Sequence, residues 1–440
     1  MNGAALLRDD DRLAAAPSPG LNGAIEVPGD KSISHRALIL GGLAEGETLI
    51  HGLLEGQDVL HTAAAVRAFG ASVERIEPGS WRVVGAPWHS PAAPIDCGNS
   101  GTGVRLLMGA AAGFPLEVTF TGDASLSRRP MDRVLDPLRD MGAEVHAAPG
   151  GTLPITIKGG ALSGIRYRNI KASAQVKSAI LLAGLRAPGS VQVIEPIASR
   201  DHSERMLRAF GCDVEIADDG TVRLGPRRKL VGTQVHVPGD PSSAAFPLVA
   251  ALVTPGSAVT IRSVMINPHR AGLFTTLQAM GANLRLDNER LVGGESVADL
   301  SARFGPLRGV EVPPERAPSM IDEFPILAIA AAFAEGRTRM HGLAELRVKE
   351  SDRLAAMIDG LNACGIDAFA QGDSLVVEGQ GGRPPGGASV AAHHDHRIAM
   401  SFLVLGLAAR APVEVDSAAM IATSFPGFVK LMRSIGGEIG

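Results

Sequence analysis

This chain of 440 residues has few cysteines, few aromatic residues and no excess of positive charge. Its three cysteines, Cys97, Cys212 and Cys364, are too widely spaced for a disulfide framework or a thiolate zinc site and suit a reducing cytoplasm. The formal net charge of −4 excludes a broadly basic surface for nucleic acid. Residues 1–20 lack a long apolar run, so we expect neither a secretory signal nor a membrane partner.

The composition is that of a globular protein with sizeable cores. Hydrophobic residues make up 45% and charged residues 20%, and the 53 glycines indicate many tight turns. The chain is too long for one ordinary core, which predicts two or three domains.

One short pattern recurs along the chain. In each copy an amphipathic segment ends in a hydrophobic residue and a glycine, and an alternating stretch typical of a strand follows. Each glycine stands where the end of a helix favours a left-handed residue. The glycines lie 72, 69, 70, 84 and 71 residues apart, which indicates an internal repeat of six units that end at Gly70, Gly142, Gly211, Gly281, Gly365 and Gly436.

Each unit also has an earlier helical segment that is apolar on most faces, which is typical of a buried helix. The first three such segments span residues 37–43, 104–112 and 178–185. We therefore expect one buried helix, one amphipathic helix and several strands in each unit. Asp58 is expected to cap the first amphipathic helix, ahead of the apolar stripe of Val59, Ala63 and Val66.

A second repetition indicates the domain boundary. The motif of residues 27–30, Val-Pro-Gly-Asp, returns at residues 237–240, three periods later. We therefore predict an α/β (α+β) fold of two domains with three units each. Domain one would comprise residues 1–29, including an N-terminal strand, plus 241–440, and domain two residues 30–240. The matching turns near 29–31 and 239–241 would form a hinge.

The first of these turns has the features of a phosphate site. Residues 27–36 predict a turn that opens a helix, where Lys31, Ser32 and Arg36 join free backbone N–H groups as donors to an anion. It is not a P-loop, because Asp30 interrupts the Gly-Lys-Ser core. An ordinary helix start is the alternative. Cationic and hydroxyl groups begin the helices of nearly every unit, however, which predicts a strongly anion-binding site.

Two further stretches suggest ligand sites but lack a necessary feature. Gly101 and Gly103 allow close approach of the backbone to a ligand, but Leu106 stands where a dinucleotide fingerprint needs its third glycine. Residues 393–397, His-His-Asp-His-Arg, suggest metal ligands, yet immediate neighbours rarely converge on one ion and no second cluster completes a site. We predict no metal.

Taken in order, these motifs resemble those of the 5-enolpyruvylshikimate-3-phosphate (EPSP) synthase family, most closely its class II branch. The resemblance extends from about Leu21 to the C-terminus. It is carried by residues 28–36, 98–102, 129–130, 173–175, 347–353 and 395–397. It implies the enolpyruvyl transferase fold, two domains of three βαβαββ units each, in agreement with the six-fold repeat.

The resemblance also implies a reaction. Members of the family are transferases of the shikimate pathway of aromatic amino-acid biosynthesis. They move the enolpyruvyl group of phosphoenolpyruvate to the 5-hydroxyl of shikimate-3-phosphate and release phosphate, without a cofactor, as two domains close. Two phosphates of about −1.5 to −2 each and two carboxylates need a concentration of cations. We expect a cytoplasmic monomer whose partners are these two small molecules.

The resemblance assigns roles residue by residue. Shikimate-3-phosphate would contact Lys31, Ser32, Arg36, Ser173, Gln175, Arg200, Asp322 and Lys349. Phosphoenolpyruvate would contact Lys31, Gly101, Arg129, Gln175, Arg353 and Arg397. The catalytic residues would be Asp322, which takes the proton of the attacking hydroxyl, Glu350 and Lys349, which move protons at the methylene carbon, and Lys31, near both substrates.

Two positions depart from the family pattern, and a third, Gly101, bears on inhibition. Many members have a lysine just before a Thr-Phe-Pro near the C-terminus, which residues 422–426, Ala-Thr-Ser-Phe-Pro, lack. Glu345 replaces a common asparagine. Herbicide-insensitive members can carry a methyl group at the position of Gly101, where glycine leaves space, so we expect a glyphosate target in which glyphosate competes with phosphoenolpyruvate.

Two alternatives stay open. UDP-N-acetylglucosamine enolpyruvyl transferases share the fold and the donor, but their pattern has Lys-Asn at the place of Lys31-Ser32 and a cysteine in the loop that here spans residues 122–130. The other alternative is a non-catalytic anion-binding protein of the same fold. The intact set of Lys31, Asp322, Glu350 and Arg397 speaks against it.

Overall fold

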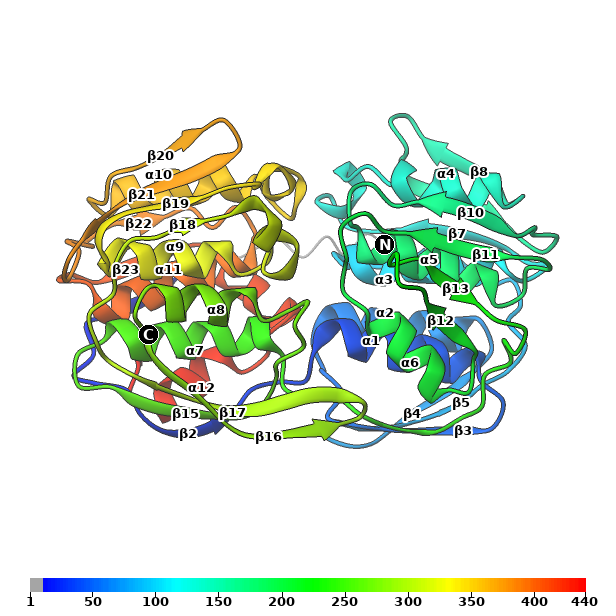
Figure 1. Ribbon diagram of the computed structural model, residues 1–440, viewed down its shortest axis with the longest axis horizontal. Helices are drawn as coiled ribbons and strands as arrows, with labels where there is room; N and C mark the ends of the chain where they lie inside the picture. Colours follow the sequence, from blue (N-terminus) through cyan, green and yellow to red (C-terminus); the bar gives the residue numbers. More distant parts are fainter. Residues whose placement is uncertain (1–10) are drawn as a thin grey trace. The chain divides into compact units, whose positions relative to one another are not determined.

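A computed structural model describes residues 11–440 (Figure 1). Helices that are buried on most faces alternate along the chain with helices that have one apolar face. In α9, for example, all ten residues of the sequence Phe-Pro-Ile-Leu-Ala-Ile-Ala-Ala-Ala-Phe are buried. The buried helices are α1 (Lys31–Leu43), α3 (Gly101–Ala112), α5 (Ala174–Gly184), α7 (Pro241–Val253), α9 (Phe324–Phe333) and α11 (His396–Ala408). The helices with one apolar face are α2 (Gln57–Ala68), α4 (Asp132–Asp140), α6 (His202–Ala209), α8 (Gly272–Ala279), α10 (Arg353–Ala363) and α12 (Phe428–Ser434).

The chain divides into two compact units. Unit 2 is Pro28–Pro238 together with Leu291–Ser296, and unit 1 is Gly239–Arg290, Val297–Gly440 and the N-terminal segment that ends at Val27. The sequence did not indicate that residues 291–296 belong with unit 2. The hinge role of the two turns remains a prediction.

Unit 2 contains three four-stranded sheets within the described residues. In sheet order they are β14 (Gln234–His236), β3 (Glu47–His51), β5 (Ser80–Val84) and β4 (Ser72–Glu77); β6 (Ile95–Asp96), β7 (Glu117–Thr121), β9 (Thr152–Lys158) and β8 (Glu144–Ala148); and β10 (Ile165–Arg168), β11 (Val191–Ile194), β13 (Val222–Leu224) and β12 (Val214–Ile216).

Unit 1 has the same number of four-stranded sheets in the part of the chain that the structure describes. They are β2 (Asn22–Glu26), β15 (Ala258–Met265), β17 (Glu295–Arg303) and β16 (Asn283–Val292); β18 (Glu311–Val312), β19 (Glu335–Met340), β21 (Ser374–Gln380) and β20 (Ala368–Gln371); and β22 (Ser389–Val390), β23 (Val413–Val415), β1 (Leu13–Ala16) and β24 (Glu438–Ile439).

One strand arrangement is repeated in all six of these sheets. The first strand runs parallel to the second, and the second pairs antiparallel with the third. The predicted fold of repeated βαβαββ units is confirmed. Strands β1, β2 and β14 complete sheets whose other strands lie far away in the sequence.

The six glycines that end the amphipathic helices all have a left-handed backbone, with φ between 77° and 113°. Only glycine adopts this conformation readily, which confirms the prediction from the repeat. The predicted cap at Asp58 is wrong. Helix α2 begins at Gln57 after Gly56, and the Asp58 carboxylate instead pairs with Lys31.

Both Val-Pro-Gly-Asp motifs end as helix caps. Asp30 accepts a hydrogen bond from the Ile33 N–H at 2.8 Å and begins α1, and Asp240 accepts one from the Ser242 N–H at 2.7 Å and begins α7. The Asp30 N–H also donates to the Pro238 carbonyl at 2.8 Å, so the two motifs, at which the chain passes from one unit to the other, lie side by side.

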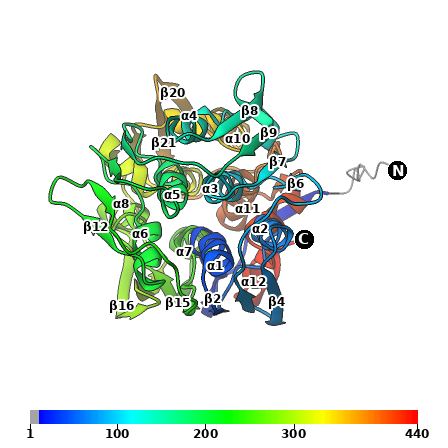
Figure 2. The ribbon, with the colours of Figure 1, turned by 90° about the vertical axis from the view of Figure 1, so that its right-hand side faces the viewer.

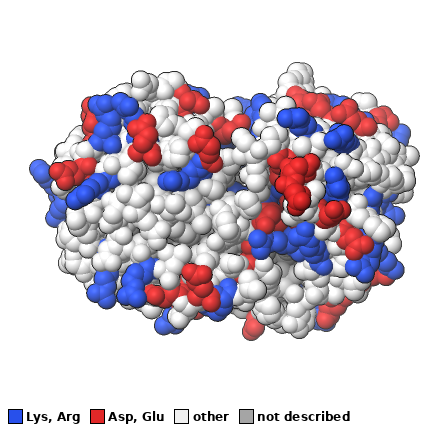
Figure 3. Space-filling view, in the orientation of Figure 1, with Lys and Arg blue, Asp and Glu red and all other residues white. Residues whose placement is uncertain are grey.

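The three cysteines are free and buried. Burial raises the pKa of Cys212 and of Cys364 to about 11 and that of Cys97 further still. A thiolate nucleophile is therefore disfavoured at neutral pH. Among residues 11–440, no helix is long and apolar enough to cross a membrane. Basic and acidic side chains are interspersed on the face shown in Figure 3.

Candidate active site

The starts of the three buried helices of unit 2 meet at one end of the unit. His35 on α1 lies with its Nε2 3.3 Å from the Oγ of Ser100, the N-cap of α3. Arg36 on α1 donates from Nη2 to the Ser178 Oγ in the second turn of α5 at 2.7 Å. Figure 2 shows α1, α3 and α5 nearly end-on. Three helix N-termini at one place favour an anion.

Lys31 is the first residue of α1, and its side chain is 18% exposed. Its ammonium group lies 3.0 Å from the Asp58 carboxylate on α2, which holds the charge near the helix start. Ser32 and Arg36 are largely buried, and Arg36 also donates from Nε to the Ser203 Oγ at 2.8 Å and from Nη1 to the Ser32 carbonyl at 2.9 Å. Arg36 therefore ties together three helices as well as adding charge.

His35 is buried among these groups. Burial holds the pKa of His35 well below its ordinary value of 6.5, and the charges of Lys31 and Arg36 act in the same direction. The neutral ring bridges the Thr62 hydroxyl at 2.8 Å and the Ser100 hydroxyl.

We expect unit 2 to become less stable as the pH is lowered, because of His35. Below about pH 6.5 the unfolded chain takes up a proton that folded His35 does not, which costs about 1.4 kcal/mol of unfolding free energy per pH unit until the folded pKa is reached. His35→Gln should remove this slope. The measurement is urea unfolding between pH 5.5 and 7.5, followed by the fluorescence of the chain's two tryptophans, Trp81 and Trp88, which both lie in unit 2. The exposed His89 offers a matched His→Gln control. Parallel stability curves for the wild type and His35→Gln would contradict the assignment.

Gly101 and Arg129 lie close together at the start of α3. Arg129 is 7% exposed and donates to the Asn99 Oδ1 at 2.6 Å and to the Ser125 Oγ at 3.2 Å. Asn99 is held in turn by Asp123, whose Oδ2 accepts from the Asn99 amide at 2.6 Å. A Cβ at Gly101 would lie 2.9 Å from an Arg129 guanidinium nitrogen. The glycine thus leaves room beside a fixed cation, where an anionic ligand can reach the helix start.

Ser173, Gln175 and Arg200 are on the third repeat of unit 2. Ser173 caps α5 by accepting from the Val176 N–H at 3.4 Å, and Gln175 is in the first turn, half-buried. Arg200 lies two residues before α6, next to its N-cap residue Asp201, and is also half-buried.

Unit 1 brings the other predicted residues into one cluster around Arg353. The Arg353 side chain is 1% exposed, and its guanidinium lies 3.3 Å from the Asp322 carboxylate, 2.6 Å from Glu350 and 2.8 Å from Asp395. Lys349 Nζ lies 3.5 Å from the Asp322 Oδ1. Arg397 Nη1 donates to the Asp322 carbonyl at 3.1 Å.

The charges of this cluster reinforce one another. Burial alone would lower the pKa of Arg353, but Asp395, Glu350 and Asp322 raise it overall, so the guanidinium stays charged. Burial would raise the pKa of Asp395, yet Arg353 outweighs it and holds that pKa below its ordinary value. Asp395 also caps α11 by accepting from the Arg397 N–H at 2.9 Å. A fixed ion network thus presents acids and bases at set positions, as proton transfer requires.

Two of the acids that hold these cations, Asp58 and Asp395, had no predicted role in the site. The sequence predicts a helix cap at Asp58 and gives Asp395 only as a part of the motif that ends at Arg397. Both are carboxylates within a few residues of a helix start, which is a signal that many simple caps share.

The Asp395 carboxylate pairs with Arg353. Its histidine neighbours do not surround it as metal ligands would, because His393 and His394 are exposed whereas His396 is buried. Asp201, His202 and Glu295 do have ligand atoms within 4.8 Å of one another. The guanidinium of Arg205 already supplies positive charge there, 2.7 Å from Asp201 and 3.8 Å from Glu295.

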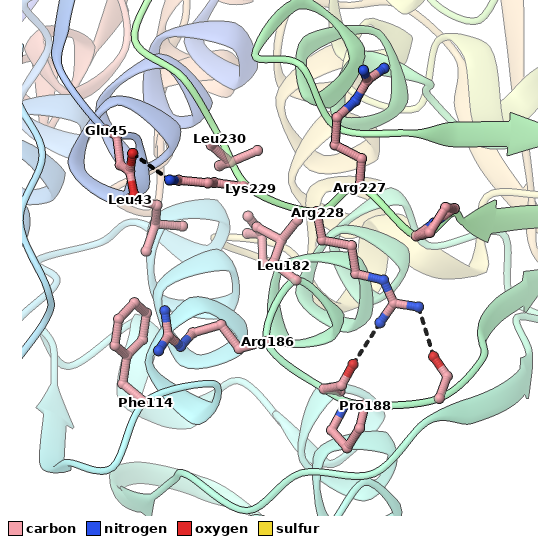
Figure 4. Close-up of a pocket in the computed structure, with 14 residues that line it drawn as sticks. Leu43, Glu45, Phe114, Leu182, Arg186, Pro188, Arg227, Arg228, Lys229 and Leu230 are labelled. Atoms are coloured by element: carbon pink, nitrogen blue, oxygen red, sulfur yellow. Dashed lines mark hydrogen bonds and ion pairs between the residues drawn. The ribbon is translucent and has the colours of Figure 1, made fainter.

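A cavity of about 880 Å³ in unit 2 contains none of the predicted site residues (Figure 4). Its cations are already paired. Arg228 donates to the carbonyls of Gly184, Ala187 and Gly189, Lys229 lies 2.7 Å from Glu45, and Arg186 stacks 4.4 Å above the Phe114 ring. The cavity lies at the C-terminal ends of α1, α3 and α5, where helix dipoles disfavour anions.

Comparison with known proteins gives consistent matches over nearly the whole chain. Residues 16–432 match the family model described as EPSP synthase (3-phosphoshikimate 1-carboxyvinyltransferase). A Caulobacter vibrioides protein named 3-phosphoshikimate 1-carboxyvinyltransferase is 59% identical over 435 residues, which cover 97% of this chain and 98% of the relative. The structure of EPSP synthase from Acinetobacter baumannii matches with a TM-score of 0.86 and 45% identity over 98% of this chain and 99% of that one. The enolpyruvyl transferase NikO from Streptomyces tendae, with a TM-score of 0.79 and 20% identity over 98% of each chain, shares the fold.

Proposed function

This chain belongs to the EPSP synthase family and transfers the enolpyruvyl group of phosphoenolpyruvate to shikimate-3-phosphate, and we propose that it does so with the two residue clusters described above. Unit 2 contributes the residues at the starts of α1, α3 and α5 together with Arg129 and Arg200. Unit 1 contributes Asp322, Lys349, Glu350, Arg353 and Arg397. The observation that carries the proposal is the Arg353 cluster, in which Asp322, Lys349, Glu350 and Arg353 lie within ion-pair distance of one another.

The substrate assignments follow the charge and position of each group. Shikimate-3-phosphate binds to Lys31, Ser32, Arg36, Ser173, Gln175, Arg200, Asp322 and Lys349. Phosphoenolpyruvate binds to Lys31, Gly101, Arg129, Gln175, Arg353 and Arg397. Fixed guanidinium groups suit phosphate and carboxylate oxygens because they can donate two parallel hydrogen bonds.

The reaction needs proton transfers at two places. The 5-hydroxyl oxygen bonds to C2 of phosphoenolpyruvate while C3 gains a proton; C3 then loses a proton as the bond from C2 to the phosphate oxygen breaks. Asp322 accepts a hydrogen bond from the hydroxyl and takes its proton. Lys349 and Glu350 transfer protons to and from C3. Lys31 stabilises negative charge on the phosphate groups.

The direct test is phosphate release from phosphoenolpyruvate by the full chain. We expect release with shikimate-3-phosphate and none with UDP-N-acetylglucosamine. Release only with the sugar nucleotide would favour the related transferase, and no release with either acceptor would favour a non-catalytic anion-binding protein.

Two coarser properties belong to the same proposal. Three free, buried cysteines fit a reducing compartment, so we place the protein in the cytoplasm. We also propose a monomer, which sedimentation equilibrium of the purified chain would test directly.

A further inference from the structure

A buried ion network lies beneath the proposed shikimate-3-phosphate residues of the third repeat of unit 2. Lys177 on α5 is 1% exposed, and its ammonium group lies 2.7 Å from both Glu195 and Glu204. Glu195 follows β11, and Glu204 is on α6. Three elements are therefore joined at one cation that is not itself part of the proposed binding set.

Glu195 is the member of this network that reaches the proposed binding segments. Its Oε1 accepts from the Asn169 amide at 2.8 Å and from the Ser199 hydroxyl at 2.7 Å. Its Oε2 accepts from Lys177 at 2.7 Å and from the Ser199 N–H at 3.3 Å. The carboxylate thus holds the backbone of the residue before Arg200.

Asn169 carries the connection onward to Ser173. The Asn169 amide nitrogen donates to the Ser173 carbonyl at 3.0 Å, and the Ser173 N–H donates to the Asn169 Oδ1 at 3.3 Å. One carboxylate therefore fixes the start of α5 and the approach to α6 at the same time.

A second hydrogen-bonded group ties the same elements to α1. Ser178 and Ser203, the immediate neighbours of Lys177 and Glu204, lie 2.7 Å apart at their hydroxyl oxygens, and both accept from the Arg36 guanidinium. The two layers leave α1, α5 and α6 little freedom to shift independently.

We propose that Glu195 is a positioning residue for shikimate-3-phosphate, which sets the distance between the Ser173 segment and Arg200. This inference rests on the proposed binding roles of Ser173 and Arg200. A buried ion pair contributes little net stability compared with apolar packing, so stability alone does not account for these buried charges. Fixing the geometry of a site for an anion is a use that apolar groups cannot supply.

The distribution of charge in the network agrees with this role. One cation faces two carboxylates, and burial raises the pKa of Glu204, against the opposing effect of Lys177. The pKa of Lys177 is raised, because Glu204 and Glu195 together outweigh burial. Glu195 accepts from all four donors, so the connections of the network to the Ser173 segment and to Ser199 pass through its carboxylate.

The test is the isosteric variant Glu195→Gln. The amide loses the charge and must present two hydrogens to groups that are themselves donors. We expect KM for shikimate-3-phosphate to rise about tenfold, the equivalent of about 1.4 kcal/mol. We expect kcat and KM for phosphoenolpyruvate to change by less than about twofold, because the chemistry at C2 and C3 is untouched.

The matched control is Glu55→Gln in the same unit. Glu55 accepts from Arg75, Trp81 and the Gly79 N–H, so its loss removes a comparable set of hydrogen bonds away from the proposed binding residues. We expect it to lower the melting temperature without changing either KM. Equal effects of Glu55→Gln and Glu195→Gln on KM for shikimate-3-phosphate would overturn the proposal.

Two milder experiments keep the proposal testable if Glu195→Gln does not fold. Ser199→Ala removes one hydroxyl donor and leaves the ion pair, and we expect KM for shikimate-3-phosphate to rise about threefold. Ser173→Ala and Arg200→Gln test the binding residues directly. A raised KM in these two variants together with an unchanged KM in the Glu195 or Ser199 variant would refute the positioning role alone. An unchanged KM in Ser173→Ala and Arg200→Gln would refute the underlying assignment and the inference with it.

Discussion

Replacement of Asp322 by asparagine should lower kcat about a thousandfold, the middle of the range for loss of a positioned acid or base. The Asp322 carboxylate lies 3.5 Å from Lys349 and 3.3 Å from Arg353. A carboxylate between two cations is a weak base, so its main contribution is to orient the hydroxyl and to accept its proton late, once the new bond is forming. An amide keeps the shape but cannot accept that proton. The measurement is phosphate release with both substrates saturating.

The control for Asp322→Asn is Asp359→Asn. Asp359 is exposed on α10 of the same unit, and its replacement makes the same change in net charge. We expect Asp359→Asn to retain full activity. If folded Asp322→Asn kept more than about a tenth of the wild-type kcat, Asp322 would not be the base.

Replacement of Gly101 by alanine should weaken inhibition by glyphosate about tenfold to a hundredfold, the effect expected of overpacking worth about 1 to 3 kcal/mol. The new methyl group would lie 2.9 Å from guanidinium nitrogens of both Arg105 and Arg129. These are the ends of flexible side chains, so they can move and the fold can persist. Because Arg129 is proposed to bind phosphoenolpyruvate, its displacement should also raise KM for that substrate, but by less than it raises the glyphosate inhibition constant.

We expect Gly101→Ala to weaken inhibition by glyphosate without lowering the stability of the protein. Gly101 is the first residue of α3 with an ordinary helical backbone, where alanine is the better helix former. The control is Gly113→Ala at the other end of the same helix, where a Cβ would meet its nearest atoms at 3.4 to 3.5 Å. We expect normal inhibition there. Inhibition constants for glyphosate measured against phosphoenolpyruvate would decide, and equal values for wild type and Gly101→Ala would contradict the prediction.

The six-unit architecture was predictable from sequence because its signals are local. A left-handed glycine at each helix end and an apolar helix in each unit follow from backbone and side-chain properties of a few neighbouring residues. Which strands form each sheet was harder to predict from the sequence. Strands β6, β18 and β22 have two residues each, too few to show a period of two. Strand β14 pairs with β3 from more than 180 residues away, which no local pattern indicates.

The same distinction applies to the candidate site. The cations and hydroxyls were predicted because they stand at helix starts within recognisable motifs. The carboxylates Asp58, Asp395 and Glu195 were not predicted as site residues, because the partner of each depends on which elements meet in the folded units. Glu195 is in no motif at all, and only its four hydrogen-bond donors show its place in the network.

The pairing of β1 with β23 has a consequence for the order in which the protein folds. Arg12, which directly precedes β1, donates to the carboxylate of Glu414 in β23, 402 residues later in the chain. At a synthesis rate of about 5 to 20 residues per second, the first strand waits about 20 to 80 s for its partner. Most of unit 2, Pro28–Pro238, is one continuous stretch and can fold on the ribosome during this time. Strand β1 is thus among the last elements to be paired, and it presents open strand edges to chaperones, or to neighbouring nascent chains, until β23 and β24 have been made.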